Sequence, residues 1–331
     1  MEKIAFLWQG VGQPIYWRTV FILMGAAVFL LVLLGLRTLR GRTLSGLVSA
    51  PLIGAGALCA ARLVHWYCCT EDYAGLSEAF TDLNTGGFSL AGALMGALAV
   101  AALLALVRII RDLPAFLDDG SLAAAAGIAV GRLGDMYGVI NHGRVLMTDP
   151  ARQTLPWASP VVNAVSGAYE WRFATFFCQS IWAAVIFLAV GAVLLRRKKR
   201  ALPDGGGAAL FLTLYCLGQI VFESTRYDAL FLRSNGFVSM EQIVSCAALL
   251  ALLIAGSLRA RKFSIRLAGC WLGFLAGMGL AGYMEYYVQR HGGEYVFAYN
   301  TMAAGLVLVF LSLVLVPPAK PKNPEKIERP L

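Results

Sequence analysis

The chain has 331 residues, of which 59% are hydrophobic and only 14% are charged. Soluble domains carry about 45–50% apolar and about 25% charged residues, and disordered or nucleic-acid-binding chains are more polar still. The composition therefore excludes those classes and predicts an all-α, polytopic helical membrane protein. The net charge of +9 is explained by the loops between the predicted helices, so we expect no nucleic-acid partner.

A membrane-spanning helix needs about 17–25 mainly apolar residues, and the sequence contains about nine such runs. They lie near residues 17–36, 46–64, 90–110, 121–140, 176–195, 206–222, 239–257, 267–284 and 300–317. The run from Leu90 to Ile110 is the most uniformly apolar, whereas polar residues interrupt the fourth and sixth runs. The tail from Pro317 onward is rich in Pro and Lys, which predicts a short disordered end.

Lys and Arg are distributed unevenly between the predicted loops. Alternate loops together with the C-terminal tail hold 18 of the 28 basic residues, the opposite loops hold 9, and Arg132 lies inside a predicted span. Because cytoplasmic loops are enriched in Lys and Arg, we expect the N-terminus outside and the C-terminus in the cytoplasm. The first run is too long for the apolar part of a signal peptide, so we expect a retained helix.

The seven cysteines give no sign of a disulfide framework or a zinc site. Their number is odd, they show no C-x-x-C spacing, and most of them lie in apolar runs. Such cysteines usually serve packing, and we expect this for Cys68 and Cys69 too. We therefore expect no metal and no cofactor.

Polar residues gather in the fourth apolar run, where the chain reads Gly131-Arg132-Leu133-Gly134-Asp135 and then His142-Gly143-Arg144. A charge at mid-helix costs about 2.5–3.5 kcal/mol on insertion scales, so such a residue normally faces the protein interior and has a function. Arg132 and Asp135 are three residues apart and can form a structural ion pair. Alternatively, Arg132 binds an anion such as a lipid phosphate, which the planar fork of guanidinium donors suits.

Small residues line one side of the same run. If the segment is helical, four glycines form a narrow stripe, along which a neighbouring helix can approach closely. These glycines are Gly127, Gly131, Gly134 and Gly138.

A second polar group lies in the sixth run, with spacings of four, four and three residues that place its members on one helical face. Its members are Tyr215, Gln219, Glu223 and Arg226. A polar face on a spanning helix either lines a cavity or pairs with another polar helix, and both alternatives bring it toward the fourth run. Arg62, near the outer end of the second run, either reaches the lipid headgroups or contributes to the same site.

Together these segments resemble the bacterial prolipoprotein diacylglyceryl transferase family. Gly131 to Asp135 with the later Gly143-Arg144 are similar to the family signature G-R-x-G-N and its following Gly-Arg pair. Residues 239–245, which read S-M-E-Q-I-V-S, are similar to the family's S-M-x-Q-x-x-S. Residues 61–63, residues 86–92 and the polar group of the sixth run follow the family order. The resemblance covers residues 15–257.

The resemblance implies a seven-helix membrane core over residues 1–257, followed by two additional helices over 258–317 and a short cytoplasmic tail over 318–331. It implies transfer of the diacylglyceryl group from phosphatidylglycerol to the cysteine of a lipoprotein precursor. The expected partners are phosphatidylglycerol, the precursor peptide and membrane lipid. The expected location is the bacterial cytoplasmic (inner) membrane.

In that reaction a thiol attacks a glycerol carbon and glycerol phosphate leaves, which calls for a base and for cationic donors. The resemblance implies that the headgroup is bound by Arg62, Arg132, Asp135, Gly143 and Arg226. It implies catalytic roles for Tyr215 and Glu223, and His142 is the candidate base by its position in the sequence.

The chain departs from the family pattern at several of these positions. The family has a His-Gly-Gly in the third span where this chain has Ala91-Gly92-Ala93, and it has an Arg where this chain has Gln219. The signature Asn is Asp135 here. These departures leave two alternatives open: a non-catalytic relative that binds an anionic phospholipid or a lipoprotein precursor, and a small transporter whose polar helices line a path.

Overall fold

The computed structural model describes residues 4–8, 13–81, 87–147, 157–163, 167–200, 204–232, 235–260, 264–290 and 295–317. The chain divides into two compact units, Met1–Ser245 and Cys246–Leu331. Within the described residues, eight helices are long and apolar enough to cross a membrane. This confirms the predicted all-α, polytopic membrane class. The predicted cytoplasmic tail, 318–331, lies outside the described residues.

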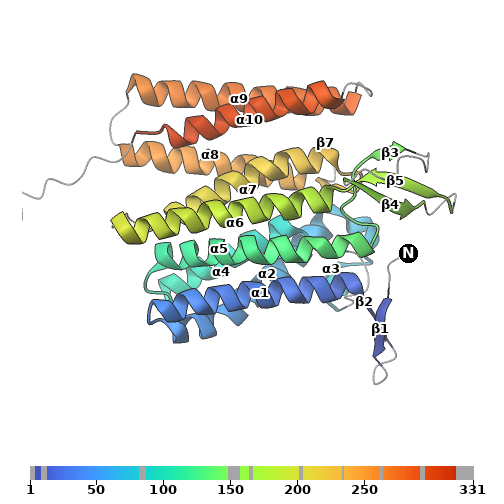
Figure 1. Ribbon diagram of the computed structural model, residues 1–331, viewed down its shortest axis with the longest axis horizontal. Helices are drawn as coiled ribbons and strands as arrows, with labels where there is room; N and C mark the ends of the chain where they lie inside the picture. The colour runs from blue at the N-terminus through green and yellow to red at the C-terminus, as the bar shows by residue number, and fades with distance from the viewer. Residues whose placement is uncertain are drawn as a thin grey trace, which may run out of the picture. The chain divides into compact units, whose positions relative to one another are not determined.

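The first unit is built mainly from long helices (Figure 1). Its helices are α1 (Trp17–Leu39), α2 (Thr43–Cys68), α3 (Leu76–Thr81), α4 (Leu90–Leu106), α5 (Leu113–Arg132), α6 (Thr175–Arg200), α7 (Gly206–Thr225) and the first turns of α8 (Met240–Ala260). The 3-10 helix η1 (Thr70–Asp72) follows α2, and a second one, η2 (Leu133–Tyr137), continues α5.

Helix α4 is shorter than its apolar run predicts. It has 17 residues, which corresponds to about 25 Å at 1.5 Å per residue. The run continues to Ile110, but Arg108 adopts φ 62°, and the N–H groups of Arg108 and Ile109 bond back to the carbonyls of Ala105 and Leu104. This pattern is a Schellman cap, which ends a helix whatever the hydropathy of the residues that follow.

Helix α5 begins and ends earlier than the predicted run of 121–140. Pro114 stands in its first turn, where the missing N–H of proline has no effect on the helix. The α-helix ends at Arg132, and the next five residues form η2. The predicted glycine stripe is therefore α-helical only as far as Gly131, Gly134 lies in η2, and Gly138 lies in extended backbone.

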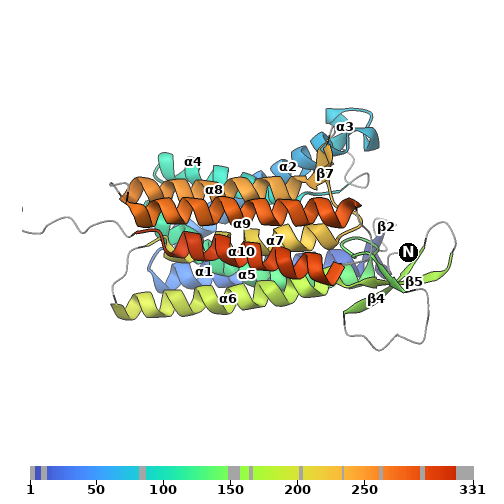
Figure 2. The same cartoon turned by 90° about the horizontal axis from the view of Figure 1, so that it is seen from above.

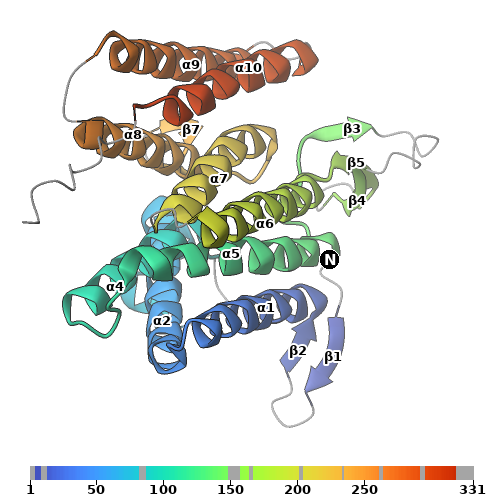
Figure 3. The same cartoon turned by 60° about the vertical axis from the view of Figure 1, so that its left-hand side comes forward.

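The glycines of α5 nevertheless permit the close helix contact that the sequence predicts. Helix α5 lies along α1 (Figure 3). A Cβ on Gly127 would stand 2.8 Å from the carbonyl oxygen of Gly25, and a Cβ on Gly134 would stand 2.7 Å from Cβ of Phe21. Helix α5 also packs against α6 and α7, so the fourth and sixth predicted runs are neighbours, as their polar faces indicate.

Short strands occupy connections that the sequence predicts only as loops. They gather near one end of the helices of the first unit (Figures 1 and 2). The pairs are β1 (Ile4–Trp8) with β2 (Gln13–Tyr16), and β6 (Phe231–Leu232) with β7 (Asn235–Ser239). The third sheet has the order β3-β5-β4, from β3 (Val145–Met147), β4 (Ala158–Val162) and β5 (Tyr169–Phe173).

At the end of the first unit opposite the strands, an ionic cluster joins the end of α1 to the starts of α2 and α5. Arg37 is fully buried, and its guanidinium donates to Asp112, Asp119 and the Ser45 hydroxyl at 2.9–3.4 Å. Arg40 also bonds Asp119, at 2.9 Å. A buried cation of this kind is stable only because carboxylates pair with it.

The second unit contains the rest of α8 together with α9 (Ile265–Arg290) and α10 (Tyr295–Val314). Helices α9 and α10 pack along each other (Figure 1). Trp271 of α9 donates its indole N–H to Ser257 of α8 at 3.1 Å. The division into a seven-helix core and two added helices, placed at residue 257 by the sequence, stays a prediction.

Candidate active site at the strand-bearing end of the first unit

Arg132 ends α5 and lies beside Asp135 of η2. Its Nη1 is 3.6 Å from Oδ2 of Asp135, and the two side chains are 16% and 7% exposed. The predicted ion pair is thus present, although its distance exceeds that of a hydrogen bond. Asp135 is held more closely by Arg18 of α1, whose Nε donates to Oδ1 at 3.0 Å. Within the described residues the guanidinium of Arg132 makes no shorter contact, so its donors remain available to a ligand.

Asp135 also begins a buried series of hydrogen-bonded side chains, whose other members carry amides. Its Oδ2 accepts from Nδ2 of Asn141 at 3.0 Å, and the same Nδ2 lies 2.7 Å from Oε1 of Gln179. Gln179 of α6 in turn donates to Gln219 of α7 at 3.4 Å. Asn141 has φ 62°, a left-handed conformation that Asn adopts more readily than most residues. These hydrogen bonds link η2 to α6 and, through Gln179, to α7.

Gly143 lies where two backbone segments approach closely. It pairs with Arg226 in an isolated β-bridge, and its N–H donates to the carbonyl of Phe173 at 2.7 Å. A Cβ at this position would stand 2.8 Å from Cβ of Phe173 and 3.0 Å from the carbonyl oxygen of Thr225. The glycine is therefore required by packing, and it brings the segment after η2 against the end of α7.

His142 is fully buried rather than solvated. Its Nδ1 lies 3.0 Å from the carbonyl of Ile140, its Nε2 lies 3.2 Å from the Ser159 hydroxyl, and its ring packs on Phe176. Burial lowers the pKa of the imidazole, and the Ile140 carbonyl and Asp135 oppose that effect. Because η2 and a loop precede it, His142 does not share a helical face with Asp135. Both ring nitrogens already have partners.

The polar face of α7 ends in a compact ionic group. Oε1 of Glu223 accepts from Arg226 at 2.7 Å, and Nε of Arg226 donates to Asp228 at 3.1 Å. Burial acts to raise the pKa of Asp228, but the adjacent Arg226 outweighs it and holds that pKa below its ordinary value. The guanidinium of Arg226 is thus engaged by two carboxylates.

Two buried polar atoms on the same face have no hydrogen-bond partner among the described residues. They are Oε2 of Glu223 and the hydroxyl of Tyr215, whose ring stacks on Phe211. Tyr215 lies within electrostatic range of Arg132, Glu223 and Glu241. A buried polar atom without a partner is costly, so these two atoms mark a place where a ligand's polar groups would be stabilised.

Glu241, in the first turn of α8, belongs to the first unit and reaches the start of α4. Its Oε1 accepts from the N–H of Ala91 at 3.0 Å and lies 3.5 Å from the Ser89 hydroxyl. The neighbouring residues form a capping box, in which Ser239 and Gln242 bond each other's backbone N–H at 3.2 and 2.9 Å. The S-M-x-Q pattern therefore fixes the start of α8 and aims residue 241 at residue 91.

Arg62 is buried at the end of α2 and does not reach outward to headgroups. Its Nη1 donates to the carbonyl of Gly87 at 2.9 Å, and its guanidinium lies over the rings of Tyr73 and Phe88. The described contacts join Arg62 to the segment before α4, and none of them reaches Arg132. Its role in the site runs through the segment that also contacts Glu241.

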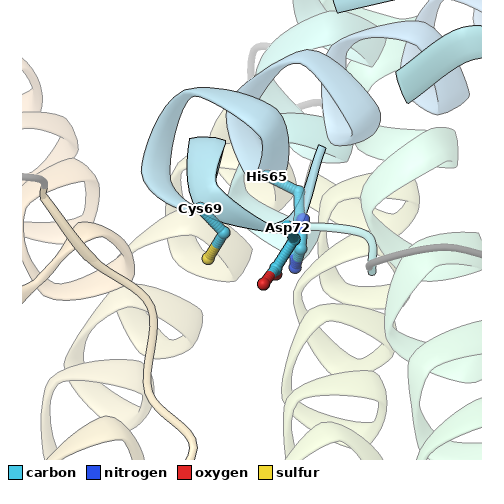
Figure 4. A group of neighbouring side chains, drawn as sticks. All are labelled: His65, Cys69 and Asp72. Carbon is cyan, nitrogen blue, oxygen red and sulfur yellow. The ribbon is translucent and has the colours of Figure 1, made fainter. Parts of the chain in front are cut away.

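The side chains of His65, Cys69 and Asp72 lie together around the end of α2 (Figure 4). The candidate ligand atoms of His65, Cys69 and Asp72 are within 4.8 Å of one another. However, Nδ1 of His65 already bonds the Tyr73 hydroxyl at 2.8 Å, and burial followed by Asp72 raises the pKa of the Cys69 thiol to about 11. The ring of Tyr73 in turn lies under the Arg62 guanidinium, so these contacts indicate a structural support for Arg62.

The structure adds site residues that the sequence analysis missed. They are Arg18, Asn141, Gln179, Asp228 and Glu241. Most of them stand at helix ends or in loops, where polar residues are common and carry no signal. Glu241 did carry a signal, because a carboxylate in the first turn of an apolar run is unusual. However, residue 241 stands at the x of the S-M-x-Q pattern, where the pattern specifies no residue.

Comparisons with known proteins show the family of this chain. A family model described as "Prolipoprotein diacylglyceryl transferase" matches residues 5–257. The phosphatidylglycerol–prolipoprotein diacylglyceryl transferase of Thermotoga maritima is 28% identical over 247 residues, which cover 72% of this chain and 79% of that protein. The proteins of that name from Synechococcus elongatus and Enterococcus faecalis are 29% and 23% identical over 71% and 80% of this chain, and over 81% and 93% of their own lengths. The resemblance inferred from the motifs is confirmed, and the chain belongs to the prolipoprotein diacylglyceryl transferase family.

Proposed function

We propose that this protein transfers the diacylglyceryl group of phosphatidylglycerol to the thiol of the lipobox cysteine, the cysteine that is modified in lipoprotein precursors. The observation that carries the proposal is the position of Arg132, a cation with available donors in a family-matched site. The unpartnered atoms of Tyr215 and Glu223 stand in electrostatic range of one another and of that cation. A phosphoglycerol headgroup has the matching parts, an anion and two hydroxyls.

The arrangement divides the work among the three arginines that the sequence predicts. Arg132 is the phosphate ligand, because its one ion pair, to Asp135, is loose and Asp135 is shared with Arg18. Arg226 is held by Glu223 and Asp228, and Arg62 by backbone carbonyls. We therefore assign Arg226 and Arg62 to positioning: Arg226 fixes the carboxylate of Glu223, and Arg62 fixes the segment before α4.

The chemistry needs stabilisation of the leaving group. The thiol sulfur attacks the diacylglycerol carbon, the carbon–oxygen bond to phosphate breaks, and glycerol phosphate leaves with increased negative charge. A guanidinium that binds this phosphate more strongly as charge develops lowers the barrier. The hydroxyl of Tyr215 and the free oxygen of Glu223 would hold the headgroup glycerol so that the phosphate faces Arg132.

The proposal includes an orientation in the membrane. The excess of basic residues in alternate loops, 18 against 9, favours an external N-terminus and a cytoplasmic C-terminus in a bacterial inner membrane. The strand-bearing end of the first unit then faces outward, because α1 starts there and α5 ends there. Precursors exported through the membrane would present their cysteine at this side.

The direct test is transfer by the purified full-length chain in lipid nanodiscs. A synthetic lipobox peptide is incubated with nanodiscs that contain phosphatidylglycerol, and its mass gain and the released glycerol phosphate are measured. We expect a peptide that carries one diacylglyceryl group, with equal amounts of glycerol phosphate. A peptide with Ser in place of the cysteine, and nanodiscs with only phosphatidylethanolamine, serve as controls.

Binding without transfer would contradict the proposal. If the protein retains phosphatidylglycerol and the peptide but gives neither product, and also fails to complement a strain depleted of its own transferase, it is a non-catalytic relative. The replacements at Ala91 and Gln219 would then be the reason.

A further inference from the structure

The carboxylate of Glu241 has an environment that the proposed phosphate site does not use. Glu241 is 4% exposed, and within the described residues no cation lies within ion-pair distance of it. Its hydrogen-bond partners among the described residues are the N–H of Ala91 and the hydroxyl of Ser89. A buried carboxylate normally pairs with a cation, so its retention here calls for another explanation.

Glu241 lies between the two parts of the site. On one side it contacts the segment that Arg62 holds, and on the other it acts electrostatically on Tyr215 and Glu223. The titratable groups on which it acts electrostatically come from α2 and α7, and they are Cys68, Tyr215 and Glu223. The contacts from α4 are uncharged.

Glu241 differs from the other carboxylates of the site in its partners. Asp135, Asp228 and Glu223 each lie in an ion pair with an arginine. Among the described residues Glu241 lies in none, and its Oε1 contacts only a backbone N–H and a hydroxyl. Its carboxylate is therefore not committed to a cation and is open to a proton donor of the substrate.

We infer that Glu241 is the general base of the reaction, accepting the proton of the substrate thiol. The inference rests on the proposed transfer function. The S–H proton moves to the carboxylate of Glu241, the sulfur forms a bond to the diacylglycerol carbon, and the carbon–oxygen bond breaks to release glycerol phosphate. The proton then passes from Glu241 to water, so that atoms and charge balance without a cofactor.

Position 91 supports this assignment. The chain has no imidazole there, since residue 91 is Ala, and Glu241 places a carboxylate oxygen 3.0 Å from the backbone nitrogen of that residue. His142, the base candidate from the sequence, has both ring nitrogens bonded elsewhere. Glu241 thus supplies an acceptor at the place where the third predicted span offers none.

A structural role for Glu241 as a cap of α4 makes a different prediction. Glu241→Gln keeps an acceptor oxygen for the N–H of Ala91 and a nearly equal volume, but it removes the basic group. The transfer assay is run with wild type, Glu241→Gln and, as a matched control, Glu285→Gln, because Glu285 is also a buried glutamate but belongs to α9. Each rate is measured from about pH 6 to about pH 9, which brackets the ordinary thiol pKa near 8.5.

We expect Glu241→Gln to reduce the rate at neutral pH by about 10²–10⁴-fold, the usual range for loss of a general base. The loss should shrink as pH rises, because more of the thiol ionises without help, and Glu285→Gln should behave as wild type. Adding Ala91→His to the Glu241→Gln protein should recover part of the neutral-pH rate.

Three results would overturn the inference. A fully active Glu241→Gln protein would leave the transferase function intact and exclude the base. A loss that is independent of pH would mean that Glu241 only caps α4. An inactive wild type would remove the transferase function itself, and with it any base. If His142→Gln shows the pH-dependent loss and Glu241→Gln does not, the base is His142.

Discussion

Arg132→Lys tests whether the proposed phosphate ligand acts through shape as well as charge. Lysine keeps the positive charge at the end of α5, but its ammonium is a point charge and cannot place two parallel donors on a phosphate. Among the described residues the guanidinium of Arg132 has one ion pair, at 3.6 Å. Most of its hydrogen-bonding capacity is therefore available to the substrate, and most of it would be lost in the lysine variant.

The expected size of the effect follows from the strength of one such contact. A hydrogen bond to a charged group contributes about 1.5–3 kcal/mol, and about 1.4 kcal/mol corresponds to a tenfold change. Losing one of two donors should lower kcat/KM by about 10- to 100-fold. Arg132→Ala should cost about 10²–10³-fold or more, because it removes the whole cation from the leaving phosphate.

The measurement is transfer to the lipobox peptide at several phosphatidylglycerol densities, which separates kcat from KM. Arg259→Lys is the matched control, because Arg259 is exposed near the end of α8. Loss in kcat would show that Arg132 binds the transition state more strongly than the lipid. A lysine variant with wild-type kcat and KM would refute the bidentate contact, and a wild-type alanine variant would refute any phosphate contact.

Other parts of the structure give independent predictions. A phosphatase fused after Lys199 should be inactive, and an active fusion would contradict the proposed orientation. Gly143→Ala should lower the free energy of unfolding by about 1–3 kcal/mol, because its Cβ would stand 2.8 Å from that of Phe173; an unchanged melting temperature would contradict the packing. Burial acts to raise the pKa of Asp112, but Arg37 and Arg42 outweigh it, so that pKa lies below its ordinary value. Its stabilisation is therefore complete above about pH 4 and is lost as pH falls through the lowered pKa. Thermal unfolding at decreasing pH should show a smaller acid-dependent loss in Asp112→Asn than in wild type.

The sequence predicts the helices and the polar pairings within one helix, because those depend on local spacing. The Arg132–Asp135 and Glu223–Arg226 pairs, each three residues apart, are present. However, Asp135 lies in η2 rather than in α5, and Arg226 follows the end of α7 with extended backbone. Helix ends are harder to predict. Hydropathy carries the third run to Ile110, but a local backbone cap ends α4 at Leu106.

Contacts between distant segments could not be predicted from spacing. Asn141 bonds both Asp135 and Gln179, the latter across 38 residues of sequence, and only the folded chain brings Gln179 to this place. The basic residues before α2 were counted as loop charges, yet Arg37 is buried and bonded to carboxylates of α5 and of the residue before it. Sequence shows that a residue is charged, whereas its partners determine whether it faces solvent, a ligand or the core.

Gln219→Arg offers a final test of the electrostatics on α7. Gln219 precedes Glu223 by four residues, a spacing at which side chains on a helix meet. Oε2 of Glu223 is buried without a partner among the described residues, whereas Gln219 has only a long contact to Gln179 at 3.4 Å. An arginine at residue 219 can donate to that oxygen.

An unsatisfied buried acceptor costs about 1–3 kcal/mol, so Gln219→Arg should raise the free energy of unfolding by up to about that amount. The control is Gln219→Met, which keeps the volume but supplies neither donor nor charge and should not stabilise the protein. Both are compared with wild type by thermal unfolding in the same nanodiscs. If the arginine variant melts below wild type, the desolvation of a further cation exceeds the gain from Glu223, and the second carboxylate oxygen is not open to residue 219.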